Sequence, residues 1–239
     1  MPERPFKHDP AVGRLVERQM RNWQLLREQS PALTENGRQL HDFVFISRVA
    51  GSNGIEVGRI VGEKLGWPVF DKQVLQTMSG DDDFRRRLYA SMDERDMSWI
   101  EEATRAFLET GFVKNDYFRR MAEAILSLAR GSPAVFIGRG AGLVLPRDRG
   151  LRVRIVANPD ECVRQYAERM KMDIGAARKE LSHLEKERAE FIKHHFHVDL
   201  ADPALYDLTL NLDHLTLSQA AELILTAHRL RMTGSDGSR

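Results

Sequence analysis

The sequence predicts an α/β fold with a central parallel sheet and helices on both of its faces. Short apolar runs, each the length of one buried strand, alternate along the chain with longer segments whose apolar residues recur at helical spacing. Apolar runs without polar alternation are typical of strands that are covered on both sides of a parallel sheet, which gives three layers. The predicted strands lie at 43–46, 69–70, 134–137, 153–156 and 208–210.

The first strand leads into a glycine-rich turn and then into a helix. Residues 47–54 have the sequence SRVAGSNG, and we refer to them as the glycine loop. Apolar residues then recur at helical spacing until Gly66 and Pro68 end the helix. Together with the strand at 69–70, this segment is predicted to form a βαβ unit.

The rest of the chain continues the alternation of helices and strands. Residues 72–130 are expected to be mostly helical, and Asn158-Pro159-Asp160 is expected to cap a helix that ends at about residue 170. A long polar helix is predicted over about 175–195 and a closing helix over 217–230.

An amphipathic helix is predicted over 11–28, before the first strand. Its apolar stripe is expected to pack on the same chain, and a homodimer contact is the alternative. We divide the chain into an N-terminal helical extension (1–40), a single domain (41–231) and a disordered tail (232–239).

Composition narrows the class of protein. The 239 residues are 42% hydrophobic and 30% charged, and the net charge is +1, so no global charge favours nucleic acid or an anionic membrane as a partner. The N-terminal residues do not resemble a signal peptide, and no apolar run approaches the ~20 residues that span a bilayer. The single cysteine, Cys162, fits a reducing compartment, and we expect a cytoplasmic protein.

Three polar turns follow predicted strands, at 47–54, 138–140 and 157–160. Ligands of open α/β sheets bind beyond the carboxyl ends of the strands, so these turns predict one shared site. Arg139 lies between two glycines at the end of a buried strand, where a long cation has no packing role. The glycine loop is expected either to bind an anion through main-chain N–H groups or to be a tight structural turn.

Several segments resemble the cytidylate-kinase-like family. The segment FVFISRVAGSNGIEVGRIVGEKLGWPVFDKQVL is similar to the opening of these proteins, whose loop reads S-R-x-x-G-S-x-G. Gly54 stands where authentic cytidylate kinases have their phosphate-binding lysine, and Gly140 stands where they have the aspartate of a G-R-D turn. The resemblance extends over roughly residues 43–227.

The resemblance implies a P-loop fold of the nucleoside-monophosphate-kinase type, with a helical acceptor-side region at 72–130 and a lid at 170–195. It implies phosphoryl transfer from ATP, with Mg²⁺, to a nucleoside monophosphate such as CMP or dCMP. Arg48, Arg139 and Arg188 would be catalytic, and Asp71, Arg139, Arg164 and Arg169 would bind the acceptor, while Arg178 is a further lid candidate. The nucleotide would lie on Gly51, Ser52, Asn53, Gly54, Ile55 and Glu56, with Glu56 as the magnesium ligand.

The missing lysine leaves alternatives open. Arg48 is expected to replace part of its charge, and Asp71 is a second candidate for magnesium. A protein that binds nucleotide without turnover and a small-molecule kinase on the same fold are the alternative functions. A histidine cluster at 194–197 is interpreted as a solvated helix end rather than a metal site. No histidine or aspartate relay accompanies Ser47 or Ser52, which argues against a serine nucleophile.

Overall fold

The computed structural model describes residues 10–29, 40–109 and 116–234. Its centre is a five-stranded sheet in the order β2-β3-β1-β4-β5, in which every neighbouring pair is parallel. The predicted fold class is thereby confirmed. The strands are β1 (Phe43–Arg48), β2 (Val69–Phe70), β3 (Ala134–Ile137), β4 (Gly150–Val156) and β5 (Leu208–Asn211).

Two helices, α2 (Gly54–Leu65) and α10 (Leu217–Gly234), cover one face of the sheet. Small and β-branched residues of these helices pack on the strands, so the helices lie close to the sheet. Gly58 of α2, for example, leaves room for the side chains of Ile46 and Ile137 beneath it. The buried cluster on this face contains Val44, Ile46, Val57, Val61, Val135, Ile137, Leu151, Val153, Ile155, Leu210, Ala220, Ala221 and Ile224.

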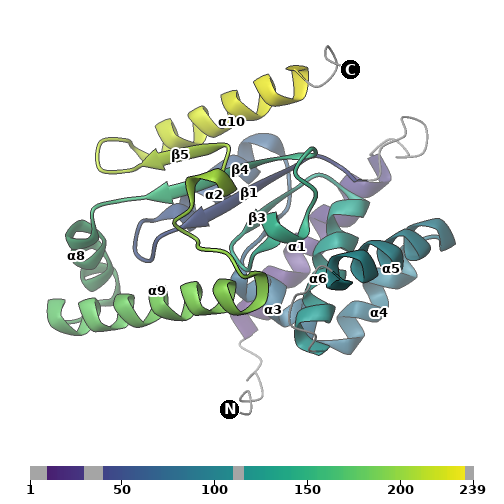
Figure 1. Cartoon of the computed structure of the whole chain (residues 1–239), viewed down its shortest axis with the longest axis horizontal. Coiled ribbons are helices and arrows are strands. Elements are labelled where there is room, and N and C mark those ends of the chain that lie inside the picture. Colours follow the sequence, from purple (N-terminus) through teal and green to yellow (C-terminus); the bar gives the residue numbers. More distant parts are fainter. Residues whose placement is uncertain (1–9, 30–39, 110–115, 235–239) are drawn as a thin grey trace.

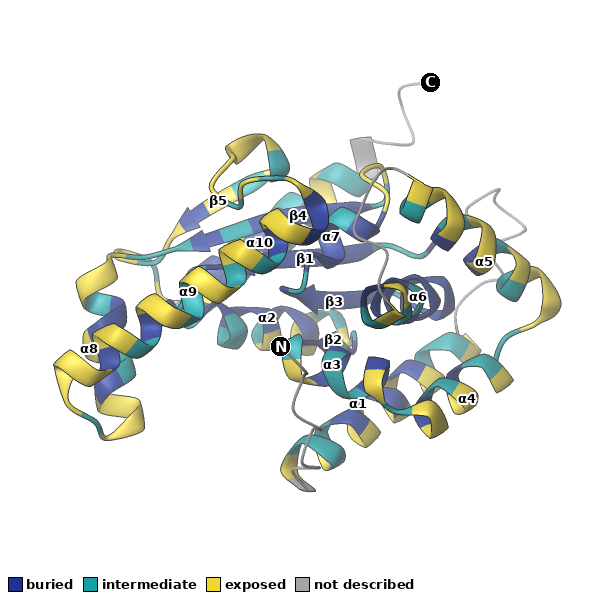
Figure 2. Cartoon of the chain, turned by 60° about the horizontal axis from the view of Figure 1, so that its bottom comes forward, coloured by how far each residue is buried: buried dark blue, intermediate teal, exposed yellow. Residues whose placement is uncertain are grey.

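The opposite face is covered by a larger group of helices. These are α1 (Pro10–Gln29), α3 (Lys72–Gly80), α6 (Asp116–Gly131) and the short α7 (Ala141–Val144), with α4 (Asp82–Ala90) and α5 (Glu94–Glu109) outside them. Figure 2 shows α6 almost wholly buried among its neighbours, whereas the outer faces of α4 and α5 are exposed. Aromatic rings from β1, β2 and β3 fill this side of the core.

The apolar stripe of α1 packs on the same chain, as expected. Val16, Met20 and Trp23 are buried, and the indole Nε1 of Trp23 donates a hydrogen bond of 2.9 Å to the carbonyl oxygen of Leu128. The side chain of Trp23 occupies the space beside Gly131 that any larger residue would need.

Beyond the carboxyl ends of the strands, α8 (Pro159–Met170) and α9 (Ile174–Phe196) form a helical hairpin. The two helices share a small core of Cys162, Val163, Ala167, Ala177 and Leu181, against which Val49 and Ala50 of the glycine loop also pack. A single 3-10 turn, η2 (Pro203–Leu205), connects α9 to β5.

Some expected boundaries differ from the structure. Ser47 and Arg48 belong to β1 rather than to a turn, because they pair with Arg154 and Ile155 of β4. Helix α10 continues to Gly234, so residues 232–234 are helical and not part of the expected tail, and residues 235–239 lie outside the described part. The division of the chain at residue 40 stays a prediction. Within the described residues, no helix combines the length and hydropathy required to span a bilayer.

Candidate functional site

A cavity of about 540 Å³ lies at the carboxyl ends of β1 and β3, between α3 and α9. Neighbouring parallel strands end at the same edge of the sheet, which explains why residues distant in sequence meet here. Its walls carry four cations, Arg48, Lys72, Arg139 and Arg188, and two carboxylates, Glu187 and Glu190. The other lining residues are Phe45, Ser47, Gln76, Gly138, Gly140, Leu184, Phe191, Ile192, His194 and Leu200.

Arg48, at the end of β1, is a buried cation with only 6% of its surface exposed. Its stem packs against Gly54, where a Cβ would lie 2.6 Å from the Cβ of Arg48, and its guanidinium reaches the space beside Gly138. Burial lowers the pKa of Arg48 to about 9, with the nearby charge of Arg188 adding to the effect. The side chain therefore stays charged at neutral pH and faces the cavity.

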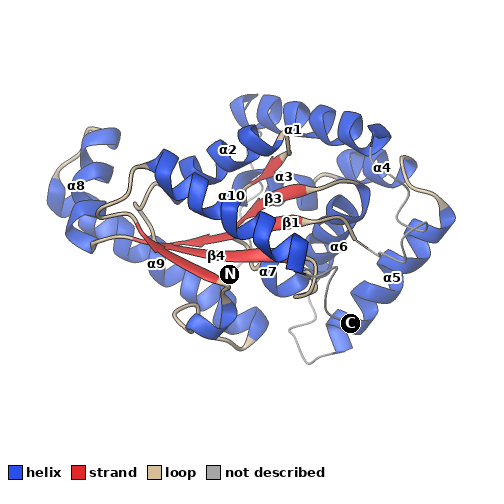
Figure 3. Ribbon diagram, turned by 90° about the horizontal axis from the view of Figure 1, so that it is seen from above, coloured by secondary structure: helices blue, strands red, loops and turns tan. Residues whose placement is uncertain are grey.

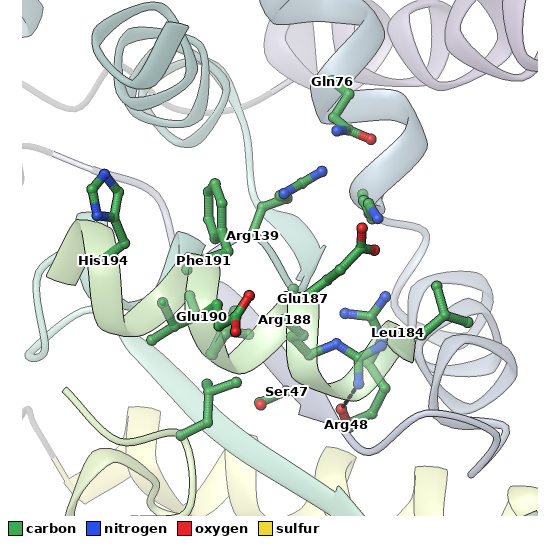
Figure 4. Close-up of a pocket in the computed structure, with 16 residues that line it drawn as sticks. Ser47, Arg48, Gln76, Arg139, Leu184, Glu187, Arg188, Glu190, Phe191 and His194 are labelled. Atoms are coloured by element: carbon green, nitrogen blue, oxygen red, sulfur yellow. Dashed lines mark hydrogen bonds between the residues drawn. The ribbon is translucent and has the colours of Figure 1, made fainter. Parts of the chain in front are cut away.

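Arg139 is held by an unusual stretch of backbone. It has a φ of 53° between Gly138 at 78° and Gly140 at 66°, so three successive residues adopt the left-handed conformation that favours glycine. Its guanidinium lies 4.7 Å from the ring centroid of Phe191. Figure 4 shows this side chain reaching across the cavity toward Gln76 of α3. A Cβ at position 140 would collide with Phe196, so the turn has no room for the aspartate of a G-R-D motif.

Arg188 joins α9 to the glycine loop. Its Nη1 donates hydrogen bonds to the carbonyl oxygen of Arg48 (2.6 Å) and to Oε2 of Glu185 (2.7 Å). Burial lowers the pKa of Arg188. Figure 4 shows the guanidinium groups of Arg48 and Arg188 side by side at one end of the cavity. The three arginines predicted as catalytic are thus brought to one cavity.

Beyond Ser47 and Arg48, the residues of the glycine loop do not line that cavity. The N–H of Ala50 donates a 2.9 Å hydrogen bond to Oε2 of Glu185. A Cβ at Gly51 would lie 2.9 Å from Cys162 and 3.0 Å from Leu181, so helices α8 and α9 close over this residue. We expected this turn and Arg139 to face the same bound ligand. From the loop, only Ser47 and Arg48 line the cavity together with Arg139, because α8 and α9 pack on Gly51.

The remaining loop residues bind neighbouring elements. Ser52 donates its hydroxyl to the carbonyl oxygen of Val49, and Ile55 packs into the core beneath α2. The side chain of Asn53 donates to Gln165 and accepts from Arg169, at 2.7 Å and 2.8 Å. A smaller cavity of about 260 Å³ lies beside Val49 and Ala50 and is lined mainly by apolar residues, together with Arg178, Ser182 and Glu185.

We call the cavity at the ends of β1 and β3 the basic cavity, because four cations line it. Three of the predicted arginines lie outside it. Arg164 is exposed and pairs with Glu161 one turn away. Arg178 pairs with Asp160 at 2.9 Å, and Arg169 donates to Asn53 of the glycine loop and lies over the ring of Tyr166. Asp71 is buried, and its Oδ1 caps α3 by accepting from the N–H groups of Gln73 and Val74.

The surroundings of Glu56 do not fit a directly bound magnesium ion. Both of its carboxylate oxygens lie 3.0 Å from Nη1 of Arg59, and the same arginine lies 3.9 Å from Asp71. Among the described residues, no three His, Cys, Asp or Glu side chains are placed to hold a metal ion. The loop also has Ile55 and Glu56 where a magnesium-binding hydroxyl would be needed.

The glycine loop does fit an anion. The carboxylate of Glu185 is an anion on the N–H of Ala50, so it occupies a position that a phosphate oxygen would otherwise take.

Sequence reasoning missed Lys72, which directly follows Asp71 at the start of α3. The signal was its place just after a predicted strand, at the same sheet edge as Arg48 and Arg139. It also missed Arg154, whose Nη1 donates to the hydroxyl of Ser47 at 3.2 Å. The hydroxyl of Tyr206 donates to Ser47 as well, at 3.1 Å.

One expectation about the histidines was wrong. His195 is not at a solvated helix end, because only 7% of it is exposed and its ring stacks on Phe118 with centroids 4.6 Å apart. Burial lowers the pKa of His195 to about 4, and the neighbouring His194 and Arg139 act in the same direction. The ring is therefore neutral at physiological pH.

Among solved structures, the chain is similar to an uncharacterized protein from Eubacterium ventriosum ATCC 27560. The two are 18% identical, the alignment covers 78% of this chain and 97% of that one, and the TM-score is 0.63. At this identity the likeness concerns the fold alone.

Two kinases are more distant. A gluconokinase from Sinorhizobium meliloti 1021 is 16% identical, with coverage of 84% and 100% and a TM-score of 0.44. A shikimate kinase from Acinetobacter baumannii, in complex with shikimate, is 16% identical, with coverage of 87% and 100% and a TM-score of 0.42. Both TM-scores are below 0.5, so neither likeness supports a conclusion about this chain.

Among proteins with curated functions, none matches the chain significantly. The model of the cytidylate kinase-like family does match, over residues 43–214, which is well over half of the chain and includes β1 to β5. The chain therefore belongs to the cytidylate kinase-like family.

Proposed function

We propose that this protein transfers the γ-phosphoryl group of ATP to a phosphorylated acceptor in the basic cavity, with CMP or dCMP as the first acceptors to test. Family membership supports kinase-type phosphoryl transfer as the class of chemistry. The observation that carries the proposal is the meeting of Arg48, Arg139 and Arg188 around one cavity at neighbouring strand ends.

Phosphoryl transfer asks a protein mainly for positioning and for positive charge around the transferred group. Arg139 has the planar donor fork that suits bidentate binding of an acceptor phosphate. Arg188 bridges the cavity and the glycine loop, so it is placed to respond to ligands on both sides. ATP, when bound, would supply the phosphoryl group, and the N–H of Ala50 would hold one of its phosphate oxygens.

A second candidate is a protein that binds nucleotide without turning it over. It is favoured by the contact between Gly54 and Arg48, which leaves no space for the missing lysine, and by Glu185 on the N–H of Ala50. Both features weaken the donor side of the site and leave the basic cavity intact.

Coupled assays of ADP release with CMP, dCMP, other nucleoside monophosphates and unphosphorylated polyols would separate these functions. Turnover with a monophosphate supports the first proposal. Clear ATP binding by calorimetry, with no turnover at any Mg²⁺ concentration, supports the second and refutes the first. Turnover of polyols alone would refute both and indicate a small-molecule kinase.

Arg139 offers the sharpest variant for this test. Arg139→Ala should raise the acceptor KM or lower kcat by at least about tenfold, equivalent to about 1.4 kcal/mol. Arg86→Ala is the matched control, because Arg86 is an exposed arginine outside the cavity and should change neither constant. Wild-type values of both constants in Arg139→Ala would rule out a role for Arg139.

A further inference from the structure

We propose that Phe191 of α9 is the positioning residue for Arg139, and that its ring holds the arginine side chain on the cavity wall with its planar donors open to a ligand. The role of Arg139 in this inference rests on the proposed function. The assignment makes α9 the support of the acceptor side of the site as well as a neighbour of the glycine loop.

The backbone that carries Arg139 packs directly on α9. A Cβ at Gly140 would collide with the ring of Phe196 and would lie 3.2 Å from Cδ1 of Ile192, and both of these residues are buried. The left-handed φ of 53° at Arg139 sets the direction in which its side chain leaves the turn. The starting point of the side chain is therefore fixed against the C-terminal end of α9.

The guanidinium of Arg139 extends among other cations. Burial lowers the pKa values of Arg48, Lys72 and Arg188, and the charge of Arg139 lowers all three further. All four side chains line the basic cavity. Because like charges repel, this neighbourhood favours withdrawal of the Arg139 guanidinium from the cavity, and an attractive contact on the wall opposes that withdrawal.

Phe191 supplies such a contact. The central guanidinium carbon of Arg139 lies over the Phe191 ring, 4.7 Å from its centroid, and the face of an aromatic ring attracts a cation. Figure 4 shows the ring and the arginine side chain next to each other on the cavity wall. An arginine can stack on a ring through its face and still donate hydrogen bonds from its edge, because its donors lie in the guanidinium plane.

The Phe191 ring is itself held by a row of rings that leads into the core. Its centroid lies 4.5 Å from that of His195, and His195 stacks on Phe118 at 4.6 Å with an interplanar angle of 12°. Phe118, on α6, is completely buried. Because burial lowers the pKa of His195 to about 4, this imidazole is neutral at physiological pH and places no cation behind the Phe191 ring. The fold thus sets the position of the ring that Arg139 lies on.

The same helix also contacts the end of β1. Arg188, three residues before Phe191, donates a hydrogen bond of 2.6 Å to the carbonyl oxygen of Arg48. Residues that are three apart lie on the same side of a helix, one turn from each other. Helix α9 therefore links two arginines of the cavity, Arg48 through its main chain and Arg139 through its side chain.

NMR spectroscopy of the full chain without ligand tests the contact directly. Side-chain protons of Arg139 that lie over a ring are shifted upfield by its ring current, and the signals that disappear in Arg139→Met identify them. Phe191→Leu keeps an apolar side chain at this half-buried position and should abolish the upfield shift, whereas Phe191→Tyr should retain most of it. Phe107→Leu is the control and should give the wild-type shift. Phe107 is another half-buried ring of this core, contacts Phe118 and Phe196, and does not line the cavity.

Kinetics with CMP as acceptor measure the consequence for the site. Phe191→Leu should raise the acceptor KM by about three- to fivefold and leave kcat within about twofold, since the ring orients Arg139 and touches no reacting atom. Phe191→Tyr should restore the wild-type KM. In the Arg139→Met background, Phe191→Leu should have no further effect, whereas a ring that only fills space would act equally in both backgrounds.

The outcomes distinguish this inference from the proposed function. An Arg139 shift that is unchanged in Phe191→Leu would overturn the inference whatever the protein catalyses. Turnover of CMP with a wild-type KM in Phe191→Leu, or with equal effects in the two backgrounds, would also overturn it and leave the transferase intact. A shift that depends on Phe191, without any ADP release, would leave the placement of Arg139 standing and refute phosphoryl transfer.

Discussion

Gly54 offers a direct test of how this site is built. It stands where related kinases have a lysine, and a Cβ there would lie 2.6 Å from the Cβ of Arg48. At an ordinary helix position, Gly→Ala stabilises a protein by about 0.5–1 kcal/mol. Overpacking in a core costs about 1–3 kcal/mol. Gly54→Ala should therefore destabilise the fold by about 1–2 kcal/mol, which reverses the usual sign.

Urea denaturation followed by circular dichroism would measure this change. Gly13→Ala is the matched control, because Gly13 also lies in a helix but has nothing within 4 Å of its Cβ position. That variant should gain stability. In a double-mutant cycle, Arg48→Gly should relieve the penalty of Gly54→Ala, with a coupling of at least about 1 kcal/mol.

Two results would refute this reasoning. If Gly54→Ala raised the free energy of unfolding as much as Gly13→Ala does, the close approach of residue 54 to the Arg48 side chain would not constrain the loop. If the double variant showed no coupling, the penalty would come from another contact, such as the one with Ile155. In the first case a lysine could be introduced at residue 54 without removing Arg48.

Two further predictions concern Glu185 and His195. Glu185→Gln should bind ATP several-fold more tightly in a fluorescence titration, because a neutral amide competes less for the N–H of Ala50; weaker binding would show that the carboxylate supports the nucleotide site. The pKa of folded His195 is about 4, below its ordinary value of 6.5. Between these two pH values the unfolded chain binds a proton that the folded chain excludes. The free energy of unfolding therefore falls as the pH drops from about 6.5 to about 4. Between about pH 7.5 and 5 this effect should contribute about 2 kcal/mol to the loss of unfolding free energy, and His195→Phe, which keeps the stacking on Phe118, should lose that contribution. Urea denaturation at both pH values would measure it, and equal pH dependence in the variant and the wild type would contradict it.

The centre of the sheet could be predicted from sequence because β1 and β3 are buried on both faces. All four residues of β3 are buried, and they form one apolar run that ends directly at Gly138. Arg139 was recognisable for the same reason, as a cation at the end of such a run. The start of β4 at Gly150 was missed, because Arg152 breaks the apolar pattern while its Nη2 donates to the carbonyl oxygen of Leu145.

How α9 packs against the glycine loop could not be predicted from sequence. Glu185 and Ala50 are 135 residues apart, and their hydrogen bond depends on how α9 packs across the strand ends. The sequence of α9 is charged on most sides, so its pattern does not distinguish Arg188 from a surface arginine that pairs with a neighbouring glutamate. Lys72 was missed for another reason. Asp71, directly before it, accounts for the start of α3 as its N-cap, so the helix start gives Lys72 no separate signal.

The burial of Trp23 shows that the hydrophobic core extends beyond the segment that the family model matches. The family match begins at residue 43, yet this indole fills a hollow beside Gly131, within the matched stretch. The hydrophobic centre of this protein is thus completed from outside the segment that the family model matches. A truncated version starting at residue 40 would expose to water the space that Trp23 fills and should aggregate.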